Sequence, residues 1–513
     1  MTPDEIIQKI LKLRGVENSE EFFNPTHPQD IVSPFDSQPA IELINKHIEL
    51  GNKIAIYGDY DVDGVCSTAI LWETLYAKSK NVFPHIPHRE SEGYGLSIKG
   101  IDHCLSQEAK LIVTVDNGIV AFDQIEYARK HDCDVIVIDH HEPDSQLPNA
   151  NVILHSTQCC AAGLSWFFCR DYLAPSTEHL ALVAIATVCD MVPLLGINRS
   201  FVKYGLEELN KTKRLGLLAL FKEARIEKVG TYEIGFIIGP RINAMGRLEH
   251  AIDSLRLLCT HQLDQAAQLA KLLNETNLLR QDETKNAVEH AMGVLDENNL
   301  PDLIVVSDAG YHPGVIGLIA GKLTEKYHRP SIAINIGETE SKASCRSVTG
   351  FNITEHLRQY SDLLVAVGGH AAAAGFTVSN LNLPKLLKEL SNTKIDPKIL
   401  VKTQRVDLEI PLELVNLDLY LKIQTLSPFG LGNPQPVFQS TNLSMSNVKS
   451  VGKEGKHLKC QVLSAKGQVV EAVYFNFPST QPLAPGPHNV SYVMDLNEWN
   501  GNKNLQLIIK DVK

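Results

Sequence analysis

The stretch NKIAIYGDYDVDG, residues 52–64, joins an apolar run to three carboxylates at alternate positions, Asp59, Asp61 and Asp63. The run NKIAIYGDYD predicts a β-strand that ends in acidic residues. Like charges placed side by side repel one another, and each carboxylate is most stable when it keeps its hydration water. The stretch therefore predicts a strand whose acidic end faces a positively charged partner.

Strands and helices alternate after this stretch. TAILWETLYAKS (68–79) and AFDQIEYARKHD (121–132) have helical patterns, whereas AKLIVTVDNG (109–118) and CDVIVIDHHEP (133–143) are β runs with acidic ends. Alternation at this spacing predicts a parallel sheet with helices on its faces. The continuous Val and Ile runs are typical of strands that are buried on both faces.

The remainder of the chain predicts further elements. Residues 164–300 are mostly helical, and LLRQDETKNAVEHAMGVLDENN (278–299) is a long polar helix that suits a connection. A second α/β segment runs from residue 301 to about residue 378. From about residue 400, short strands alternate with Gly, Asn and Pro turns, which predicts a small β-barrel of the oligonucleotide-binding type. A β-sandwich is the alternative, because periodicity alone does not separate the two.

The fold class is therefore α/β with an added β-barrel, since 513 residues are too many for one ordinary core. We expect five parts: an N-terminal helical segment at 1–50, an α/β domain with a parallel sheet at 51–200, a helical connecting region at 201–300, a second α/β domain at 301–392, and the barrel at 400–513. The first α/β domain carries the acidic strand ends and is the expected site of chemistry.

Composition sets weaker limits. Hydrophobic residues make up 44% and charged residues 21%, which is typical of soluble globular proteins. No apolar run approaches the ~18 residues of a bilayer span, and the N-terminus has no apolar signal region. The ten cysteines are scattered without a C-x-x-C motif, which fits a reducing compartment. We therefore expect a cytoplasmic protein without a membrane partner.

The net charge of −12 disfavours a nucleic-acid partner at first sight, because phosphate binding usually requires a basic surface. This argument is weak, since metal-binding carboxylates would account for part of the charge and a local basic groove can exist on an acidic protein. Nucleic acid therefore stays open as a substrate.

The acidic strand ends define a candidate site. In open parallel sheets, ligands bind at the carboxyl ends of the strands. Three expected strands end there in Asp59/Asp61/Asp63, in Asp116 and in Asp139-His140-His141, and Asp190 ends the apolar helical run ALVAIATVCD. A carboxylate at the end of a buried stretch is costly unless it is paired or bound to a metal. We therefore expect these side chains to converge on one rim.

The donor set indicates the metal. Carboxylates with one or two imidazoles and no thiolate suit Mn²⁺ or Mg²⁺ better than zinc. The donors exceed what one ion needs, so we expect two ions, and ion pairs about 3.5–4 Å apart are typical of phosphodiester chemistry. Taken alone, each motif has a simpler interpretation. The D-x-D-x-D-G run also resembles the start of a calcium loop, VDNG is typical of a turn, and DHH is typical of a solvated loop. Their combination at successive strand ends favours the metal pair.

These motifs resemble a known superfamily. DYDVDG (59–64), VDNG (115–118), IDHHEP (138–143) and Asp190 are similar to the motifs of the DHH phosphoesterases, and GGHAAAAGF (368–376) is similar to that of their DHHA1 domain. The segments HRESEGYGLS (88–97), IGPRINAMGRL (238–248), YHPGVIGLIAGKL (311–323), SCRS (344–347) and PFGLGNPQPVF (428–438) resemble the RecJ single-strand-specific exonucleases. The resemblance covers nearly the whole chain from residue 50. It implies a DHH domain at 51–200, a DHHA1 domain at 301–392 and an OB-fold at 400–513.

The resemblance also implies roles for the acidic and histidine residues. The implied ligands of two Mn²⁺ or Mg²⁺ ions are Asp59, Asp61, Asp63, Asp116, His140 and Asp190. Asp116 is the expected bridge between the ions, and Asp116, His140 and His141 are the expected catalytic residues. His141 would assist the attacking water or have a structural role, and its spacing leaves both open.

Further segments that resemble RecJ imply substrate binding. The implied residues are Arg89, Tyr94, Arg241, Asn243, Arg247, His312, Ser344, Arg346, Ser347, Gly369 and His370. Arg is well suited to bidentate phosphate recognition, and in RecJ-like enzymes such groups bind the 5′-phosphate. Without the resemblance, a surface ion pair would be the simpler interpretation of any one of these arginines.

The expected function is a single-stranded-DNA-specific 5′→3′ exonuclease of DNA repair and recombination, which releases mononucleotides by two-metal catalysis. The alternative is a DHH phosphoesterase that acts on short oligonucleotides or cyclic dinucleotides, but such a substrate needs no additional β domain. A catalytically silent scaffold is a third hypothesis, and the complete set of motif acids disfavours it. The expected partners are single-stranded DNA and either a single-strand-binding protein or a helicase.

Overall fold

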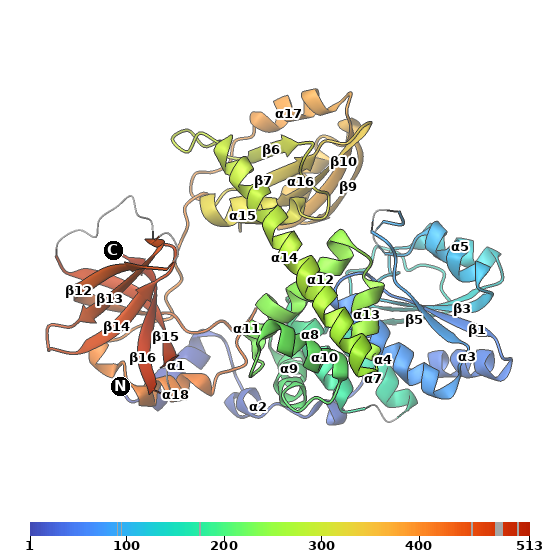
Figure 1. The fold of residues 1–513 in the computed structure, drawn as a ribbon, viewed down its shortest axis with the longest axis horizontal. Coiled ribbons are helices and arrows are strands. Elements are labelled where there is room, and N and C mark those ends of the chain that lie inside the picture. Colours follow the sequence, from blue (N-terminus) through green and yellow to red (C-terminus); the bar gives the residue numbers. More distant parts are fainter. Residues whose placement is uncertain (90, 94, 174–175, 453–454, 478–485, 500–501) are drawn as a thin grey trace. The chain divides into compact units, whose positions relative to one another are not determined.

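The computed structural model describes residues 1–89, 91–93, 95–173, 176–452, 455–477, 486–499 and 502–513 (Figure 1). The chain forms two compact units. Val32–Asp190 and Tyr204–Lys402 make up the first, here called the two-sheet unit. Met1–Ile31, Met191–Lys203 and Thr403–Lys513 make up the second, here called the barrel unit. Among the described residues, no helix is both long and apolar enough to cross a membrane.

The first sheet of the two-sheet unit confirms the predicted parallel architecture. Its strands are β1 (Lys53–Tyr57), β2 (Val82–His85), β3 (Ala109–Val115), β4 (Asp134–Asp139) and β5 (Val152–His155), in the order β2-β1-β3-β4-β5. Every neighbouring pair is parallel. The chain leaves β1 toward one edge and continues from β3 toward the other, so the order reverses between β1 and β3. This switch point is where an open parallel sheet binds its ligands.

The helices around this sheet are α3 (Gln38–Glu49), α4 (Val62–Lys78), α5 (Ile98–Ser106), α6 (Phe122–Lys130), α7 (Ala161–Tyr172) and α8 (Glu178–Cys189). Helix α4 packs against α7 and α8, and it is buried from Val62 through Leu71. It begins six residues before the predicted start at residue 68, because Asp61 caps it: Asp61 Oδ1 accepts a hydrogen bond from the Gly64 N–H at 3.0 Å. The cap places the motif carboxylates on the helix N-terminus.

A helical region follows, as predicted. It contains α9 (Gly196–Leu209), α10 (Leu215–Ala224), α11 (Thr231–Glu233), the π-helical turn η2 (Ile234–Ile238), α12 (Gly239–Leu248), α13 (Ile252–Cys259) and the 31-residue α14 (Leu263–Gly293). Helix α14 packs on α10, α12 and α13 and then continues toward the second sheet (Figure 1). It is the predicted connecting helix, although it starts earlier than residue 278.

The second sheet has mixed topology. Its strands are β6 (Ile304–Asp308), β7 (Ser331–Asn335), β8 (Glu340–Arg346), β9 (Leu364–His370) and β10 (Ala373–Ser379), in the order β6-β7-β8-β10-β9. Only β6 and β7 are parallel to one another. The accompanying helices are α15 (Ile316–Tyr327), α16 (Ile353–Arg358), the 3-10 turn η3 (Ser361–Leu363) and α17 (Leu383–Ser391).

The barrel unit is a closed sheet. Strands β12 (Phe438–Val451), β13 (His457–Leu463), β14 (Val469–Tyr474), β16 (Asn502–Val512) and β15 (His488–Trp499) pair in that order, and β12 also pairs with β15. This closure confirms a barrel and excludes the sandwich. The remaining elements of the unit are α1 (Pro3–Leu13), α2 (Ser19–Phe23), η1 (Pro28–Asp30), β11 (Leu408–Glu409), η4 (Leu412–Leu414) and α18 (Leu417–Gln424). Ile6 and Ile10 of α1 share one hydrophobic core with Leu419 and Phe438, so the N-terminal helix belongs to the barrel.

Substitution of Gly64 should damage the first sheet at its functional edge. An added Cβ would lie 2.6 Å from the backbone nitrogen and oxygen of Asp59, and neither backbone atom can move without shifting β1. We expect Gly64→Ala to lower the free energy of unfolding by about 1–3 kcal/mol, measured by urea titration. Gly293→Ala is the matched control, since nothing lies within 4 Å of its Cβ position. Equal stability of the two variants would contradict the close contact between Gly64 and the backbone of Asp59.

Candidate active site

The first two motif carboxylates lie directly after β1. Asp59 is fully buried, and its Oδ1 accepts a hydrogen bond from the Tyr60 N–H at 2.7 Å. Asp61 caps α4 through the Gly64 N–H. Each therefore has one carboxylate oxygen committed to the backbone of its own turn, which fixes the direction of the side chain.

Asp63 lies in the first turn of α4 and is 2% exposed. Its two oxygens accept hydrogen bonds from the N–H groups of Ala161, at 2.7 Å, and Ala162, at 2.8 Å. These residues begin α7, whose first N–H groups have no partner within the helix. The N-terminus of α7 therefore holds the Asp63 carboxylate in place and stabilises its charge.

Asp116 follows β3, across the switch point from β1. Its φ of +64° is a left-handed backbone conformation, which few residues other than glycine adopt, although Asp tolerates it better than most. Its N–H donates to the Ile138 carbonyl at 3.0 Å, and the residue is 2% exposed. The unusual backbone is thus held by β4 and turns the carboxylate onto the rim of the sheet.

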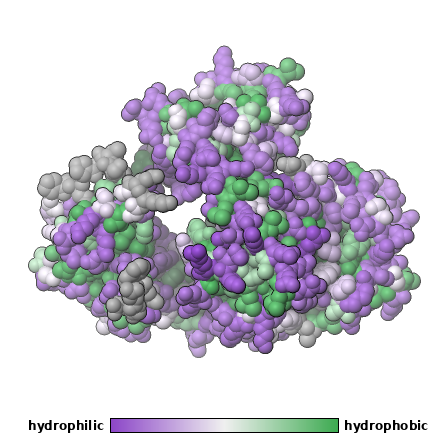
Figure 2. All heavy atoms as spheres, in the orientation of Figure 1, coloured by the Kyte–Doolittle hydropathy of each residue, from purple (hydrophilic) through white to green (hydrophobic). Residues whose placement is uncertain are grey.

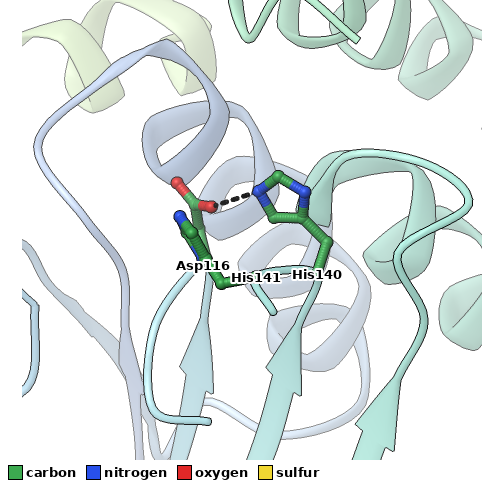
Figure 3. Close-up of side chains that lie close together, drawn as sticks. All are labelled: Asp116, His140 and His141. Atoms are coloured by element: carbon green, nitrogen blue, oxygen red, sulfur yellow. Dashed lines mark ion pairs between the residues drawn. The ribbon is translucent and has the colours of Figure 1, made fainter. Parts of the chain in front are cut away.

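Three carboxylates converge on His140, the residue after β4. Its Nε2 lies 3.3 Å from Asp116 Oδ1, as Figure 3 shows by a dashed line. The same nitrogen lies 3.7 Å from one oxygen each of Asp63 and Asp190. Asp190 reaches the rim as the C-cap of α8. His140 Nε2 and Asp190 Oδ2 are buried, and among the described groups they have no hydrogen-bond partner. Buried donors and acceptors without partners are the mark of a site completed by another group.

Two overlapping sets of side chains can each hold an ion. One set is Asp116, His140 and His141, and the other is Asp63, His140 and Asp190, with all ligand atoms of a set within 4.8 Å of one another. Oxygen and imidazole donors without thiolate fit Mn²⁺ or Mg²⁺. Asp59 and Asp61 are outside both sets, but their charges act on Asp116. The structure therefore brings all six predicted ligands to one rim and places four of them around a shared centre.

Asp139 positions His141. Its Oδ1 accepts hydrogen bonds from the backbone N–H groups of His140 and His141. The same oxygen accepts a hydrogen bond from His141 Nδ1 at 2.7 Å. Its Oδ2 accepts a hydrogen bond from the Ile119 N–H at 2.9 Å. These contacts tie both carboxylate oxygens of Asp139 to neighbouring groups. They also fix the orientation of the His141 ring. The sequence shows Asp139 at a strand end but does not distinguish this role from that of a ligand.

The electrostatics of the cluster favour a cation. Burial, followed by the charges of neighbouring carboxylates, raises the pKa of Asp116 well above its ordinary value and that of Asp190 to about 8. Burial also raises the pKa of Asp63 and lowers that of His140, which keeps its imidazole neutral. Neutral imidazole and ionised carboxylate are the metal-binding forms, so a divalent cation would satisfy both.

An arginine cluster lies next to this centre. Arg247 of α12 is half-buried, and its Nη1 donates to the Gly314 carbonyl at 3.0 Å. Burial, followed by the charges of Arg89, Arg280 and Arg346, lowers the pKa of Arg247 to about 10. Among the residues that the structure describes, no carboxylate forms an ion pair with any of the four. Four guanidinium groups without a counter-charge form a site for an anion.

Tyr60 separates the two sites. It lies between Asp59 and Asp61 in sequence, and the guanidinium of Arg89 is 5.2 Å from the centre of its ring. A Cβ on Gly246 would lie 2.5 Å from the Tyr60 carbonyl, so α12 packs closely on this turn. The negative and positive clusters are thus neighbours across one side chain.

Ser344 and Arg346 of β8 belong to the positive site. Arg346 Nη1 donates to Ser344 Oγ at 3.2 Å and to the Cys345 carbonyl at 2.8 Å. Ser347 is directed elsewhere, since its Oγ donates to the Phe351 carbonyl at 2.7 Å. Arg280, on α14, also belongs to the cluster but was missed, because LLRQDE in a polar helix resembles an ordinary solvated face.

Comparisons with known proteins agree with this geometry. Family models match at residues 53–187 (DHH family, N-terminal domain), 301–394 (DHHA1 domain) and 406–511 (RecJ OB domain). The single-stranded-DNA-specific exonuclease RecJ of Bacillus subtilis is 34% identical over 99% of this chain and 67% of its own length. The single-stranded-DNA-specific exonuclease RecJ of Thermus thermophilus is 31% identical over 90% of this chain and 69% of its own length. The chain belongs to the RecJ family.

Solved RecJ structures share the fold. The crystal structure of RecJ in complex with Mn²⁺ from Thermus thermophilus has a TM-score of 0.86 at 27% identity, covering 98% of this chain and 75% of that one. The same enzyme in complex with Mg²⁺ has a TM-score of 0.78 at 26% identity, covering 98% and 74%. The two ions are those that the donor set of this RecJ-family chain fits.

The other predicted substrate residues of this RecJ-family chain have varied settings. Arg241 donates to Asn274 Oδ1 at 3.0 Å and to the Ile237 carbonyl at 2.8 Å, and Asn243 is half-buried on α12. His312 Nδ1 accepts from the Gly314 N–H at 3.0 Å, in the turn that also contacts Arg247.

Gly369, with φ of +134°, and His370 are exposed on the β9–β10 hairpin. Tyr94 lies outside the described residues.

Stability of the metal-free protein should fall as pH rises. The folded-state pKa of Asp190, about 8, lies above its ordinary value of 3.8, so between these values the folded chain binds more protons than the unfolded chain. In EDTA, Tm should therefore decrease from about pH 5 to about pH 8, and Mn²⁺ should reverse the decrease. Asp190→Asn should show a shallower slope, with the exposed Asp123→Asn as control. A slope unchanged by Asp190→Asn would contradict the crowding of charge.

Proposed function

We propose that this chain is a metal-dependent, single-stranded-DNA-specific exonuclease that hydrolyses phosphodiester bonds from the 5′ end. One observation carries the proposal: a buried carboxylate–imidazole cluster and an unpaired arginine cluster are neighbours across Tyr60. The first suits metal-assisted hydrolysis, and the second suits the terminal phosphate of the strand to be cut.

The metal centre is proposed to hold two Mn²⁺ or Mg²⁺ ions. Asp63, Asp116, His140 and Asp190 would bind them, with Asp61 and Asp59 close by. When bound, the ions supply an activated water and stabilise the charge on the phosphorus oxygens. The α7 N-terminus orients Asp63, and β4 holds the backbone of Asp116. The chain thus fixes its ligands before any ion arrives, which lowers the reorganisation that binding requires.

His141 is proposed to handle a proton. Although burial opposes its charging, the hydrogen bond to Asp139 raises the pKa of His141 to about 9. Asp139 keeps the proton on Nδ1, so Nε2 faces the cluster. In that position Nε2 would donate to a phosphate oxygen or to the departing nucleotide.

The arginine cluster is proposed to bind the 5′-phosphate. Arg89, Arg247, Arg280 and Arg346, with the Ser344 hydroxyl, offer many donors, and no carboxylate among the described residues forms an ion pair with them. A terminal phosphate carries more charge than a phosphodiester, so such a pocket prefers a strand end. If the terminal phosphate is fixed there, the first bond inside the strand reaches the metal centre, which gives 5′→3′ polarity and mononucleotide products.

The barrel unit favours a long substrate over a short one. The RecJ OB domain model matches residues 406–511 of this unit, and OB-folds bind single strands by stacking and by positive charge. A dinucleotide or a cyclic dinucleotide needs no such module. We propose DNA repair and recombination as the setting, with a single-strand-binding protein or a helicase as partner. A cytoplasmic location is supported by the ten free cysteines, eight of them buried.

Loss of the bridging carboxylate should abolish cleavage. Asp116→Asn keeps a side chain that tolerates the left-handed backbone but removes the charge. We expect Mn²⁺-dependent release of nucleotides from single-stranded DNA to fall by more than about 100-fold, while Tm in EDTA does not fall. The exposed Asp282→Asn on α14 should behave as wild type. Activity of Asp116→Asn within a few-fold of wild type would refute the assignment of Asp116.

Loss of Arg346 should weaken the preference for a 5′-phosphate. The measurement is kcat/KM for oligonucleotides with a 5′-phosphate and with a 5′-hydroxyl. We expect Arg346→Ala to lower the ratio between them by about 10-fold or more, with a smaller change in kcat at saturation. Arg256→Ala is the control, because Arg256 is exposed and pairs with Asp253. An unchanged ratio would place the phosphate site elsewhere.

A further inference from the structure

Two aromatic rings stack on each other at the surface of the helical region. Tyr232 and Phe236 are 63% and 71% exposed, their ring centroids are 5.0 Å apart and their planes differ by 28°. Among the described residues with large, exposed hydrophobic side chains, the only other aromatic is Phe475 of the barrel unit. The face drawn in Figure 2 is mostly hydrophilic, with smaller apolar areas between. Two adjoining exposed rings therefore require an explanation beyond ordinary surface composition.

The helix that carries these rings is fixed against the metal centre. Tyr232 lies in α11 and Phe236 in the π-helical turn η2, which packs on α8, and Figure 1 shows α11 beside α8. Cys189 Sγ contacts the Ile234 carbonyl at 3.8 Å, and Cys189 immediately precedes the ligand Asp190. Gly239 also lies against the Cys189 sulfur. One face of the turn is therefore anchored at the end of α8, and π-helical turns are frequent at functional sites.

The chain leads directly from the rings to an arginine, Arg241. Arg241 follows Phe236 by five residues, near the start of α12, and its guanidinium folds back to the Ile237 carbonyl. The charge of Arg241 acts on Arg280, which belongs to the arginine cluster. Exposed aromatic rings followed along the chain by cations match the way in which proteins bind single strands, where bases stack and phosphates meet positive charge.

We propose that Tyr232 and Phe236 form a stacking platform for an unpaired base of the single-stranded substrate, with Arg241 receiving an adjacent phosphate and Arg280 linking this path to the 5′-phosphate site. The proposal rests on the exonuclease function proposed above, and it adds residues that would contact the DNA strand outside the metal centre. A base would extend the existing two-ring stack by one ring. Because duplex bases already stack on their neighbours, only an unpaired base gains this contact, so the platform would contribute to single-strand specificity.

Binding of a fluorescent, 5′-phosphorylated single-stranded oligonucleotide in EDTA, followed by anisotropy, tests the platform without cleavage. The double variant Tyr232→Ala/Phe236→Ala should raise Kd by about 5- to 100-fold. Phe236→Trp should bind within about 2-fold of wild type, because it keeps a ring that stacks. Leu263→Ala is the matched control, since Leu263 is 72% exposed and apolar but not aromatic. A double variant that binds as wild type would overturn the proposal.

Oligonucleotides with one abasic site at successive positions from the 5′ end give a second readout that a folding defect would not produce. Wild type should lose affinity at one or two positions, and the double variant should show no further loss at those positions. The same abasic profile in both proteins would overturn the platform.

The two proposals fail differently. If wild type degrades single-stranded DNA but the double variant is unchanged in both assays, only the platform is wrong. If wild type neither binds nor cleaves single-stranded DNA, the exonuclease function fails and the platform fails with it.

Discussion

Repulsion among buried carboxylates at one edge of a parallel sheet is the constraint on which this structure depends. Asp63, Asp116 and Asp190 surround one imidazole with little access to water, so they can all be ionised only if a cation joins them. The fold opposes this repulsion with the N-terminus of α7 and with a left-handed backbone at Asp116. Both devices hold a carboxylate close to other carboxylates, an arrangement that a bound cation would stabilise.

A phosphodiesterase of this kind needs a second charge arrangement of the opposite sign. Arg247 is half-buried near three other arginines, which is unfavourable unless an anion is bound. The carboxylate cluster and the arginine cluster lie on either side of Tyr60. A bound metal would reduce the repulsion among the carboxylates, and the phosphates of a DNA strand would reduce the repulsion among the arginines. The net charge of −12 hides this pattern, because it averages over a surface on which the relevant charges are local.

The sequence predicted the position of the metal-binding rim, because the residues that form it follow directly after recognisable strands and helices. Acidic residues and histidines that follow apolar runs indicated this rim, since the carboxyl ends of parallel strands lie along the same edge of the sheet. Strands β2 and β5 were missed because each is four residues long and only half-buried, which leaves little pattern to detect. The role of Asp139 and the membership of Arg280 depend on hydrogen bonds and tertiary contacts that no spacing rule contains. The exposure of Phe236 is likewise a property of the packed helix and not of its sequence.

The most direct test of the account is digestion of 5′-phosphorylated, 3′-labelled single-stranded DNA with Mn²⁺, beside a matched duplex and a dinucleotide. If the metal centre and the arginine cluster act together, the labelled strand shortens stepwise from its 5′ end, mononucleotides are released and the duplex is spared. Cleavage of the dinucleotide alone, with the long strand intact, would contradict it, because the arginine cluster and the barrel would then have no part in substrate selection.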